Sequence, residues 1–137
     1  MNPYSKPLPA PDADSAPYWD GCKQHRLLIQ RCEACASFRF PAGPVCPNCN
    51  SREARWMPAS GRGTVFSWIV VRHPVPAEVY GAEVPYTVAL IDLEEGVRMA
   101  SNVIGCEPEA LHAGMRVSVH FDDVTPEISL PRFRPRE

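Results

Sequence analysis

The sequence predicts a mainly β protein with a short N-terminal helix, a small cysteine ribbon and a C-terminal β-barrel. Two C-x-x-C pairs, Cys32/Cys35 and Cys46/Cys49, lie within one short stretch and favour a ribbon over a helix there. From Thr64 onward, runs rich in β-branched and aromatic residues alternate with turns that contain glycine or proline. The chain also carries 16 prolines, which keep any helices short.

The cysteine pairs predict a metal site. A tight turn inside each C-x-x-C pair aims two sulfurs at one point, and two such turns close a tetrahedral shell. Asn50 follows the second pair, where the backbone is often left-handed and Asn tolerates it. We therefore predict a structural Zn²⁺ on Cys32, Cys35, Cys46 and Cys49. Four thiolates leave no open position, so this zinc would not activate water or polarise a substrate.

Other uses of these cysteines remain open at this stage. Two disulfides would need an oxidising compartment, for which the sequence gives no sign. A rubredoxin-like iron site fits the same spacing, because sulfur tetrahedra suit both metals. Cys22 and Cys106 lie outside the cluster, and we expect both to be buried or half-buried structural thiols.

Bulk properties exclude several classes of protein. A length of 137 residues allows one ordinary domain or two small ones. The net charge of −2 gives no electrostatic case for nucleic acid binding. No apolar run approaches the roughly 18 residues of a membrane span. The N-terminus lacks the hydrophobic core of a signal peptide, so we expect a cytoplasmic protein.

The N-terminal segment should be an extended arm followed by a short helix. Prolines in the first thirteen residues exclude a helix there: Pro3, Pro7, Pro9 and Pro11. Asp14 or Ser15 offers an N-cap, and the helix should end near Gln24. Tyr18 and Trp19 lie on this helix, which is too small to bury them alone.

The rest of the chain should consist of strands. Leu27–Ile29 leads into the first cysteine pair, and Trp56 with Met57 provides a short return. The barrel strands expected are Thr64–Arg72, Tyr86–Leu93, Val97–Val103, Met115–Phe121 and a short fifth strand, Ile128–Leu130. Four or five short strands with one hairpin suggest a Greek-key barrel, most commonly an OB-fold. We expect the arm and helix, the zinc ribbon, and the barrel with its basic tail to occupy residues 1–26, 27–58 and 59–137.

These segments, in this order, resemble the zinc-ribbon/OB-fold family catalogued as domain of unknown function 35. The stretches that carry the resemblance are PYWDG, LLIQRCEAC, CPNC, GRGTVFSW, VPYTVALIDLEEGVRM, GMRVSVHF and LPRFRP. They cover the chain from about Pro17 onward. The resemblance implies a small accessory subunit that binds a larger thiolase-like, aldolase or hydratase enzyme. Ribbon and barrel would help to dock an acyl-CoA, while the partner would carry the catalytic residues.

No set of residues in the sequence predicts catalysis by this chain alone. None of its four histidines stands in a motif with a nucleophile and a carboxylate. Cys106 lies beside Glu107 and Glu109, and neighbouring carboxylates raise a thiol pKa, which disfavours a nucleophile. We therefore predict no catalytic residues, and the accessory role of the family agrees with this.

Contacts to CoA and to a partner are expected at two sets of residues. Arg39, Arg62 and Arg72 lie near turns or strand ends and are candidates for phosphate contacts, because Arg binds phosphate bidentately. Aromatic and aliphatic side chains near both ends are candidate interface anchors: Tyr4, Leu8, Tyr18, Trp19, Leu130 and Phe133. The alternative is that Trp19 and Phe133 cover the barrel of this same chain.

Two other functions compete with the accessory-subunit hypothesis. Ribbons and OB barrels also bind single-stranded nucleic acid, and the chain has aromatic and basic residues that could do so. Binding of that kind would weaken steeply with salt. An electron carrier of the rubredoxin kind would contain iron and would be coloured.

Overall fold

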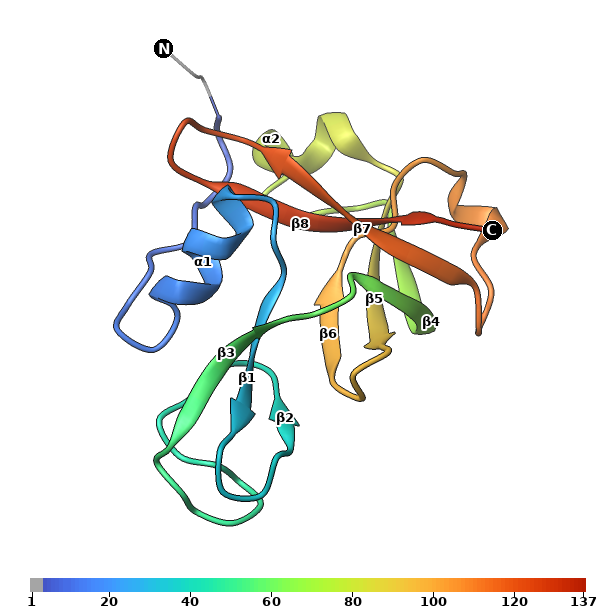
Figure 1. Cartoon of the computed structure of the whole chain (residues 1–137). Helices are drawn as coiled ribbons and strands as arrows, with labels where there is room; N and C mark the ends of the chain where they lie inside the picture. The colour runs from blue at the N-terminus through green and yellow to red at the C-terminus, as the bar shows by residue number, and fades with distance from the viewer. Residues whose placement is uncertain (1–3) are drawn as a thin grey trace.

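The computed structural model describes residues 4–137, so Pro3 of the expected arm lies outside the described residues. The described chain forms a mainly β structure with two sheets (Figure 1). A three-stranded sheet in the order β2-β1-β3 lies beside a five-stranded sheet in the order β6-β5-β4-β7-β8. The predicted fold class is confirmed.

The N-terminal half consists of helix α1 and the ribbon sheet. Its elements are α1 (Ala16–Lys23), β1 (Leu28–Cys32), β2 (Phe38–Arg39) and β3 (Ala54–Pro58). Before α1, Ser15 donates its backbone N–H to Asp12 Oδ1 at 2.8 Å, and Asp12 N donates to Ser15 Oγ at 3.1 Å. This turn satisfies polar groups ahead of the helix. Both β2 and β3 pair antiparallel with β1.

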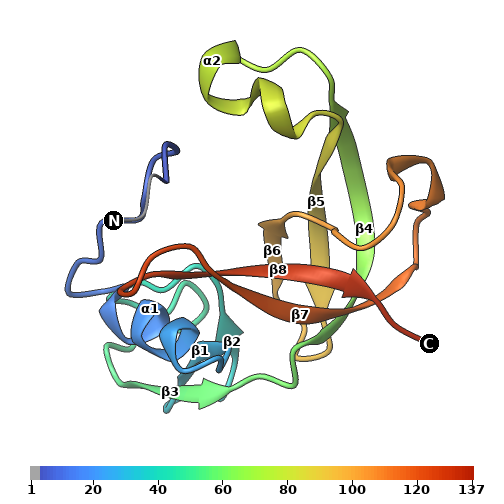
Figure 2. The same ribbon diagram turned by 90° about the horizontal axis from the view of Figure 1, so that it is seen from above.

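The C-terminal half forms the barrel. Its elements are β4 (Arg62–Val71), α2 (Ala77–Tyr80), η1 (Gly81–Glu83), β5 (Tyr86–Leu93), β6 (Arg98–Ser101), η2 (Pro108–Ala110), β7 (Arg116–Asp123) and β8 (Ser129–Pro135). Figure 2 shows α2 and η1 projecting beyond the ends of β4 and β5, away from the ribbon. They form two short, consecutive helical segments in the connection between β4 and β5.

A parallel bridge between Val103 and Phe133 draws the two edges of the five-stranded sheet together. Phe133 N donates to Asn102 O at 2.9 Å, and Ile104 N donates to Phe133 O at 2.8 Å. The sheet therefore curls into an OB-fold rather than staying open. A register shift between Val65 and Ser67 in β4 adds a β-bulge to the bend.

The C-terminal tail is a strand, which corrects the sequence-based expectation. Strand β8 continues through Pro131 and Pro135 and pairs with β7 along its length. Phe133 N points away from β7, toward Asn102 O, and Pro131 and Pro135 lie two residues to either side of it. Because hydrogen-bonding directions alternate along a strand, the missing proline N–H groups cost no bond to β7.

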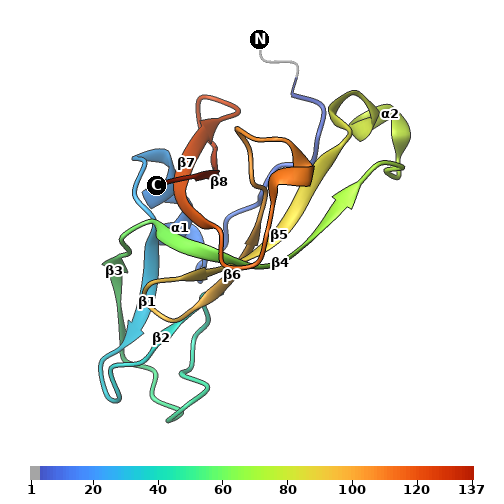
Figure 3. The ribbon, with the colours of Figure 1, turned by 90° about the vertical axis from the view of Figure 1, so that its right-hand side faces the viewer.

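One hydrophobic cluster joins the helix, the ribbon and the barrel. Tyr18 and Cys22 of α1 pack with Ile29 of β1 and with barrel residues that include Val117 and Phe133. Tyr18 and Phe133 are both buried within this chain, so the expectation that they anchor a partner is wrong. For Phe133 the alternative is correct: it fills the barrel of its own chain. Figure 3 shows α1 lying alongside β7 and β8.

No helix in residues 4–137 is long and apolar enough to cross a membrane.

Candidate metal centre and ligand cavity

Each C-x-x-C pair forms a knuckle with the same backbone geometry. Ala36 N donates to Cys32 O at 2.9 Å, and Asn50 N donates to Cys46 O at 2.9 Å. Ala36 and Asn50 both have left-handed backbone, with φ of 65° and 67°. The left-handed residue after the second pair was predicted. Its counterpart after the first pair was missed, because Ala gives no sequence signal for this conformation.

The two knuckles bring the four sulfurs together. All four Sγ atoms lie within 4.8 Å of one another. Cys32 Sγ lies 3.5 Å from Cys49 Sγ, and Cys35 Sγ lies 3.7 Å from Cys46 Sγ. A tetrahedral zinc with sulfurs at about 2.3 Å requires sulfur–sulfur separations of about 3.8 Å. The four cysteines therefore fit one tetrahedral ion, as the sequence spacing predicts.

Hydrogen bonds favour the thiolate at two of the four sulfurs, whereas the neighbouring cysteine side chains raise the pKa of Cys49 to about 12. Ser37 Oγ lies 3.0 Å from Cys35 Sγ, and this contact, together with the backbone N–H of Ser37, lowers the pKa of Cys35 to about 6. Backbone N–H groups of Cys49 and Asn48 lower the pKa of Cys46. Metal ligation by cysteine requires the thiolate, so these neighbours prepare the site for a cation. A shell of four thiolates would hold that cation structurally, without an open position.

The three arginines expected to contact CoA lie in separate places. Arg39 is only 8% exposed and holds the ribbon together: Nε donates to Gln30 Oε1 and Nη2 to Gly43 O, both at 2.8 Å. Arg62 and Arg72 lie at opposite ends of β4, about 30 Å apart at 3.3 Å per residue. The structure does not bring the three together, so a role in phosphate contact remains a prediction for each.

Arg62 and Arg72 are also engaged by carboxylates. Arg62 binds Glu94 through two hydrogen bonds, Nε to Oε2 at 3.0 Å and Nη2 to Oε1 at 2.9 Å. Arg72 Nη2 lies 3.3 Å from Glu109 Oε1. A phosphate at either position would have to compete with these carboxylates.

A cavity of about 660 Å³ lies between the N-terminal arm and the barrel. Tyr4, Lys6 and Pro7 of the arm line one side, and Tyr80 and Glu83 of the α2–η1 excursion line another. The remaining walls come from β5, from the segment after β6, and from β7 and β8. This volume falls within the range of known small-molecule sites.

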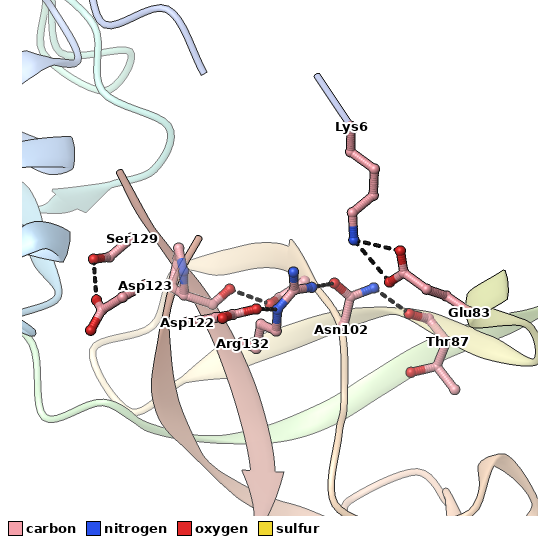
Figure 4. Close-up of polar contacts among 10 residues, drawn as sticks. Lys6, Glu83, Thr87, Asn102, Asp122, Asp123, Ser129 and Arg132 are labelled. Carbon is pink, nitrogen blue, oxygen red and sulfur yellow. Dashed lines mark hydrogen bonds and ion pairs between the residues drawn. The ribbon is translucent and has the colours of Figure 1, made fainter. Parts of the chain in front are cut away.

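A polar network lines the cavity (Figure 4). Arg132 Nε donates to Asp122 Oδ2 at 2.9 Å, and Arg132 Nη1 donates to Asn102 Oδ1. The amide nitrogen of Asn102 donates in turn to Thr87 O at 2.6 Å. These bonds fix the orientation of Arg132 and Asn102 before any ligand binds.

An ion pair ties the arm to the other side of the cavity. Lys6 Nζ lies 2.7 Å from Glu83 Oε2 and 2.8 Å from Oε1. Lys6 and Arg132 are thus each paired with a carboxylate, which leaves the cavity close to neutral.

Sequence reasoning missed the cavity residues. Lys6, Glu83, Asn102 and Arg132 belong to segments far apart in the chain, and none stands in a motif. Only the folded arrangement brings them to one place. The one hint was Lys6, a lone cation among the prolines of the arm.

Two features resemble parts of a catalytic site: the contacts among Ser129, Asp123 and His25, and the thiol of Cys106. Neither has the arrangement that activates a nucleophile. Asp123 Oδ1 accepts hydrogen bonds from both Ser129 Oγ and His25 Nε2, the latter at 2.8 Å. The carboxylate therefore separates the serine from the histidine, whereas nucleophile activation needs the histidine in the middle. Cys106 is half-buried at the cavity, and its pKa is raised by burial and by Glu107. Neither arrangement generates a nucleophile.

Comparison with family profiles identifies both halves of the chain. The profile described as the ChsH2 rubredoxin-like zinc ribbon domain matches residues 19–54. The profile described as the ChsH2 C-terminal OB-fold domain matches residues 56–122.

Two curated relatives match over part of their length. The chain is 43% identical over 130 residues to a probable enoyl-CoA hydratase alpha subunit of Thermomonospora curvata, covering 95% of this chain and 40% of the relative. It is 29% identical over 102 residues to the benzoylsuccinyl-CoA thiolase subunit BbsA of Thauera aromatica, covering 72% of this chain and 60% of the relative. The chain thus spans less than two thirds of each relative.

A solved structure matches almost completely. One chain of the structure named Ltp2-ChsH2(DUF35) aldolase is 43% identical, with a TM-score of 0.84, covering 93% of this chain and 98% of that chain.

Proposed function

We propose that this chain, which belongs to the DUF35 family of ChsH2-type zinc-ribbon and OB-fold proteins, is a non-catalytic subunit that binds a larger acyl-CoA enzyme. The partner would be a thiolase-like enzyme, an aldolase or a hydratase. The observation that carries the proposal is the near-complete match to one chain of the Ltp2-ChsH2(DUF35) aldolase. The family resemblance deduced from the sequence is thereby confirmed.

The curated relatives support a role in acyl-CoA metabolism. One is named as a subunit of an enoyl-CoA hydratase and the other as a subunit of a benzoylsuccinyl-CoA thiolase, so both names refer to a CoA thioester substrate. Each is a subunit of a larger assembly by its name. Both names refer to enzymes that act on an acyl-CoA, so we describe the partner's reaction only as the conversion of an acyl-CoA.

In this proposal, Cys32, Cys35, Cys46 and Cys49 hold one structural zinc. Their sulfur–sulfur separations and hydrogen bonds support it. Zinc in such a shell stabilises a segment that has little core of its own. The reduced thiolates it requires also fit the expected cytoplasmic location.

The cavity between arm and barrel supports a role in docking acyl-CoA. Its near-neutral walls combine tyrosines, prolines and a fixed polar network. Such walls suit an uncharged ligand segment with amide groups, such as the pantetheine chain, better than a phosphate. Because the cavity is open, the partner would complete the site.

A tagged version of the chain, purified from its native host, tests the proposal. We expect mass spectrometry to identify a co-purifying thiolase-like, aldolase or hydratase enzyme in stoichiometric amount. The complex should turn over an acyl-CoA, and the separated chain should not. A monodisperse preparation of this chain that converts an acyl-CoA by itself would refute the proposed role.

A further inference from the structure

The outer face of the barrel is apolar at the centre of its strands. Along β5, Thr87, Ala89 and Ile91 point into the core, whereas Val88 and Leu90 point outward and are exposed. An antiparallel sheet with one solvated face normally shows polar residues there. The exposed valine and leucine therefore depart from the pattern expected of a surface that stays in water.

Neighbouring strands extend this apolar surface. Ile69 of β4 lies directly opposite Val88 and is 61% exposed. Ala100 of β6 lies directly opposite Leu90 and is also exposed. Directly opposite residues of an antiparallel pair share one face of the sheet.

The β-bulge adds an aromatic side chain to the same surface. Val65 is buried, and Phe66, the unpaired residue of the bulge, follows it and is 50% exposed. Arg98 of β6 lies 3.6 Å from the centre of the Phe66 ring. Since β5 lies between β4 and β6, the side chains of Phe66 and Arg98 meet over β5. We call Phe66, Ile69, Val88, Leu90 and Ala100 the outer face.

Phe66 is held in place before any partner binds. Arg98 stacks on the ring and is itself fixed by Asp92, with Nε 2.5 Å from Oδ1 and Nη2 3.2 Å from Oδ2. An exposed aromatic ring that is already ordered loses little conformational entropy when a partner covers it. Aromatic anchors of this kind carry much of the binding energy in protein interfaces.

Charge and position narrow the choice of partner. Asp92 pairs with Arg98 at the border of the outer face, and Glu94 pairs with Arg62 at the end of β4. These pairs leave no excess positive charge, which nucleic acid would require. The outer face also lies over the first three barrel strands, and the second and third form the face on which OB-folds usually bind oligonucleotides and oligosaccharides, so the chemistry of this face, apolar and without excess positive charge, decides for a protein partner.

We propose that the outer face is the surface on which the larger acyl-CoA enzyme docks, through a complementary apolar and uncharged patch. This inference rests on the proposed function and locates its main contact. An apolar centre with a rim of ion pairs is the usual anatomy of a protein interface. No residue of the outer face lines the ligand cavity, so docking here would leave the cavity walls free to take part in binding substrate.

The test compares Ile69→Glu and Leu90→Glu in the tagged full-length chain with the matched control Val75→Glu. Val75 is 90% exposed but lies in the loop after β4, outside the outer face. All three variants replace an exposed aliphatic residue by a carboxylate. Zinc content and thermal unfolding would verify that each variant is folded. We expect at least a tenfold loss of the co-purifying acyl-CoA enzyme for Ile69→Glu and Leu90→Glu, and none for Val75→Glu.

Each other outcome counts against a specific statement. If the wild-type chain retains an acyl-CoA enzyme and both outer-face variants retain it equally, the inference fails and the proposed function stands. If the wild-type chain retains no such enzyme, the proposed function fails and the inference fails with it. A dimer of this chain, or a complex with single-stranded nucleic acid, that Leu90→Glu abolishes would also overturn the inference.

Discussion

At the scale of single residues, Cys22 and Cys106, the two cysteines outside the metal shell, differ in burial. Cys22 is fully buried beside Tyr18, and burial raises its pKa to about 12. A thiol with that pKa is about one part in ten thousand thiolate near pH 8, and only the thiolate reacts with alkylating reagents. In the folded, zinc-loaded protein we expect iodoacetamide to label Cys106 and to leave Cys22 unmodified. Peptide mass spectrometry would detect this, and both should react in denaturant. Equal labelling rates in the folded protein would contradict the assignment.

The same pKa shift makes stability depend on pH. Unfolded Cys22 ionises near its ordinary pKa of 9.0, whereas folded Cys22 keeps its proton up to about pH 12. As pH rises above 9, the unfolded state releases this proton first, so its contribution to stability is present below pH 9 and is lost toward pH 12. We expect Cys22→Ala to flatten the decline in unfolding free energy above pH 9, as measured by urea titration. An unchanged slope would show that the thiol does not contribute.

Gly63 shows a different constraint, because β4 and β5 approach each other closely at this residue. A Cβ at position 63 would lie 2.5 Å from Asp92 O and 3.0 Å from Ile91 Cγ2. We expect Gly63→Ala to destabilise the protein by about 2 kcal/mol, since the clashing atom is backbone and cannot turn aside. Gly43→Ala is the control, with nothing within 4 Å of its Cβ. Equal midpoints for both variants in thermal unfolding would argue against the close approach.

At the scale of elements, the ribbon depends on its metal more than the barrel does. The knuckles contribute few residues to the hydrophobic cluster, whereas all five barrel strands contribute or adjoin it. We expect Cys46→Ser to remove about one zinc per chain and to disorder the knuckles, while amide exchange in the barrel strands stays slow. Cys106→Ser, outside the shell, should retain the zinc. Iron in the wild-type protein, or zinc unchanged in Cys46→Ser, would refute the site.

Strands with a clear period were predictable from sequence, and strands that break a local rule were not. Tyr86–Leu93 was predicted with its observed bounds, because inward and outward positions alternate beside a hairpin turn. Strand β8 was expected to be short because prolines normally end strands. It extends to Pro135 because Pro131 and Pro135 place their missing donors on the side away from β7. That fact depends on pairing partners, which a single sequence does not reveal.

The metal site, the cavity and the outer face also differ in how far the sequence predicts them. The four cysteines were predictable, because a metal shell is encoded by local spacing and needs only two turns. The cavity and the outer face were not. Lys6 meets Glu83 across 77 residues, and Ile69 lies opposite the outward-facing Val88 only because a bulge shifts the register of β4. The residue types in both places are ordinary, so their significance comes from the fold.

At the scale of the whole molecule, the N-terminal arm is a wall of the cavity rather than part of the core. Tyr4, Lys6 and Pro7 line the cavity, and none of them belongs to the hydrophobic cluster. Tyr18 and Cys22 of α1 do belong to it. A deletion that tests the arm must therefore stop before α1, because removing residues 1–20 would also remove core packing.

Deleting residues 1–11 should leave the fold, the zinc and the partner in place while removing one side of the cavity. If acyl-CoA docks there, the Michaelis constant of the proposed complex for its acyl-CoA should rise several-fold. The turnover number should change little, because in the proposed complex the partner supplies the catalytic groups. Glu83→Gln would weaken only the Lys6 ion pair and should have a smaller effect, since an exposed pair contributes little. Steady-state kinetics of the three complexes measures both effects. An unchanged Michaelis constant in the deletion variant would exclude the arm from acyl-CoA binding. An equal increase in the Michaelis constant for Glu83→Gln would attribute the effect to the Lys6–Glu83 ion pair rather than to the cavity wall that the arm forms.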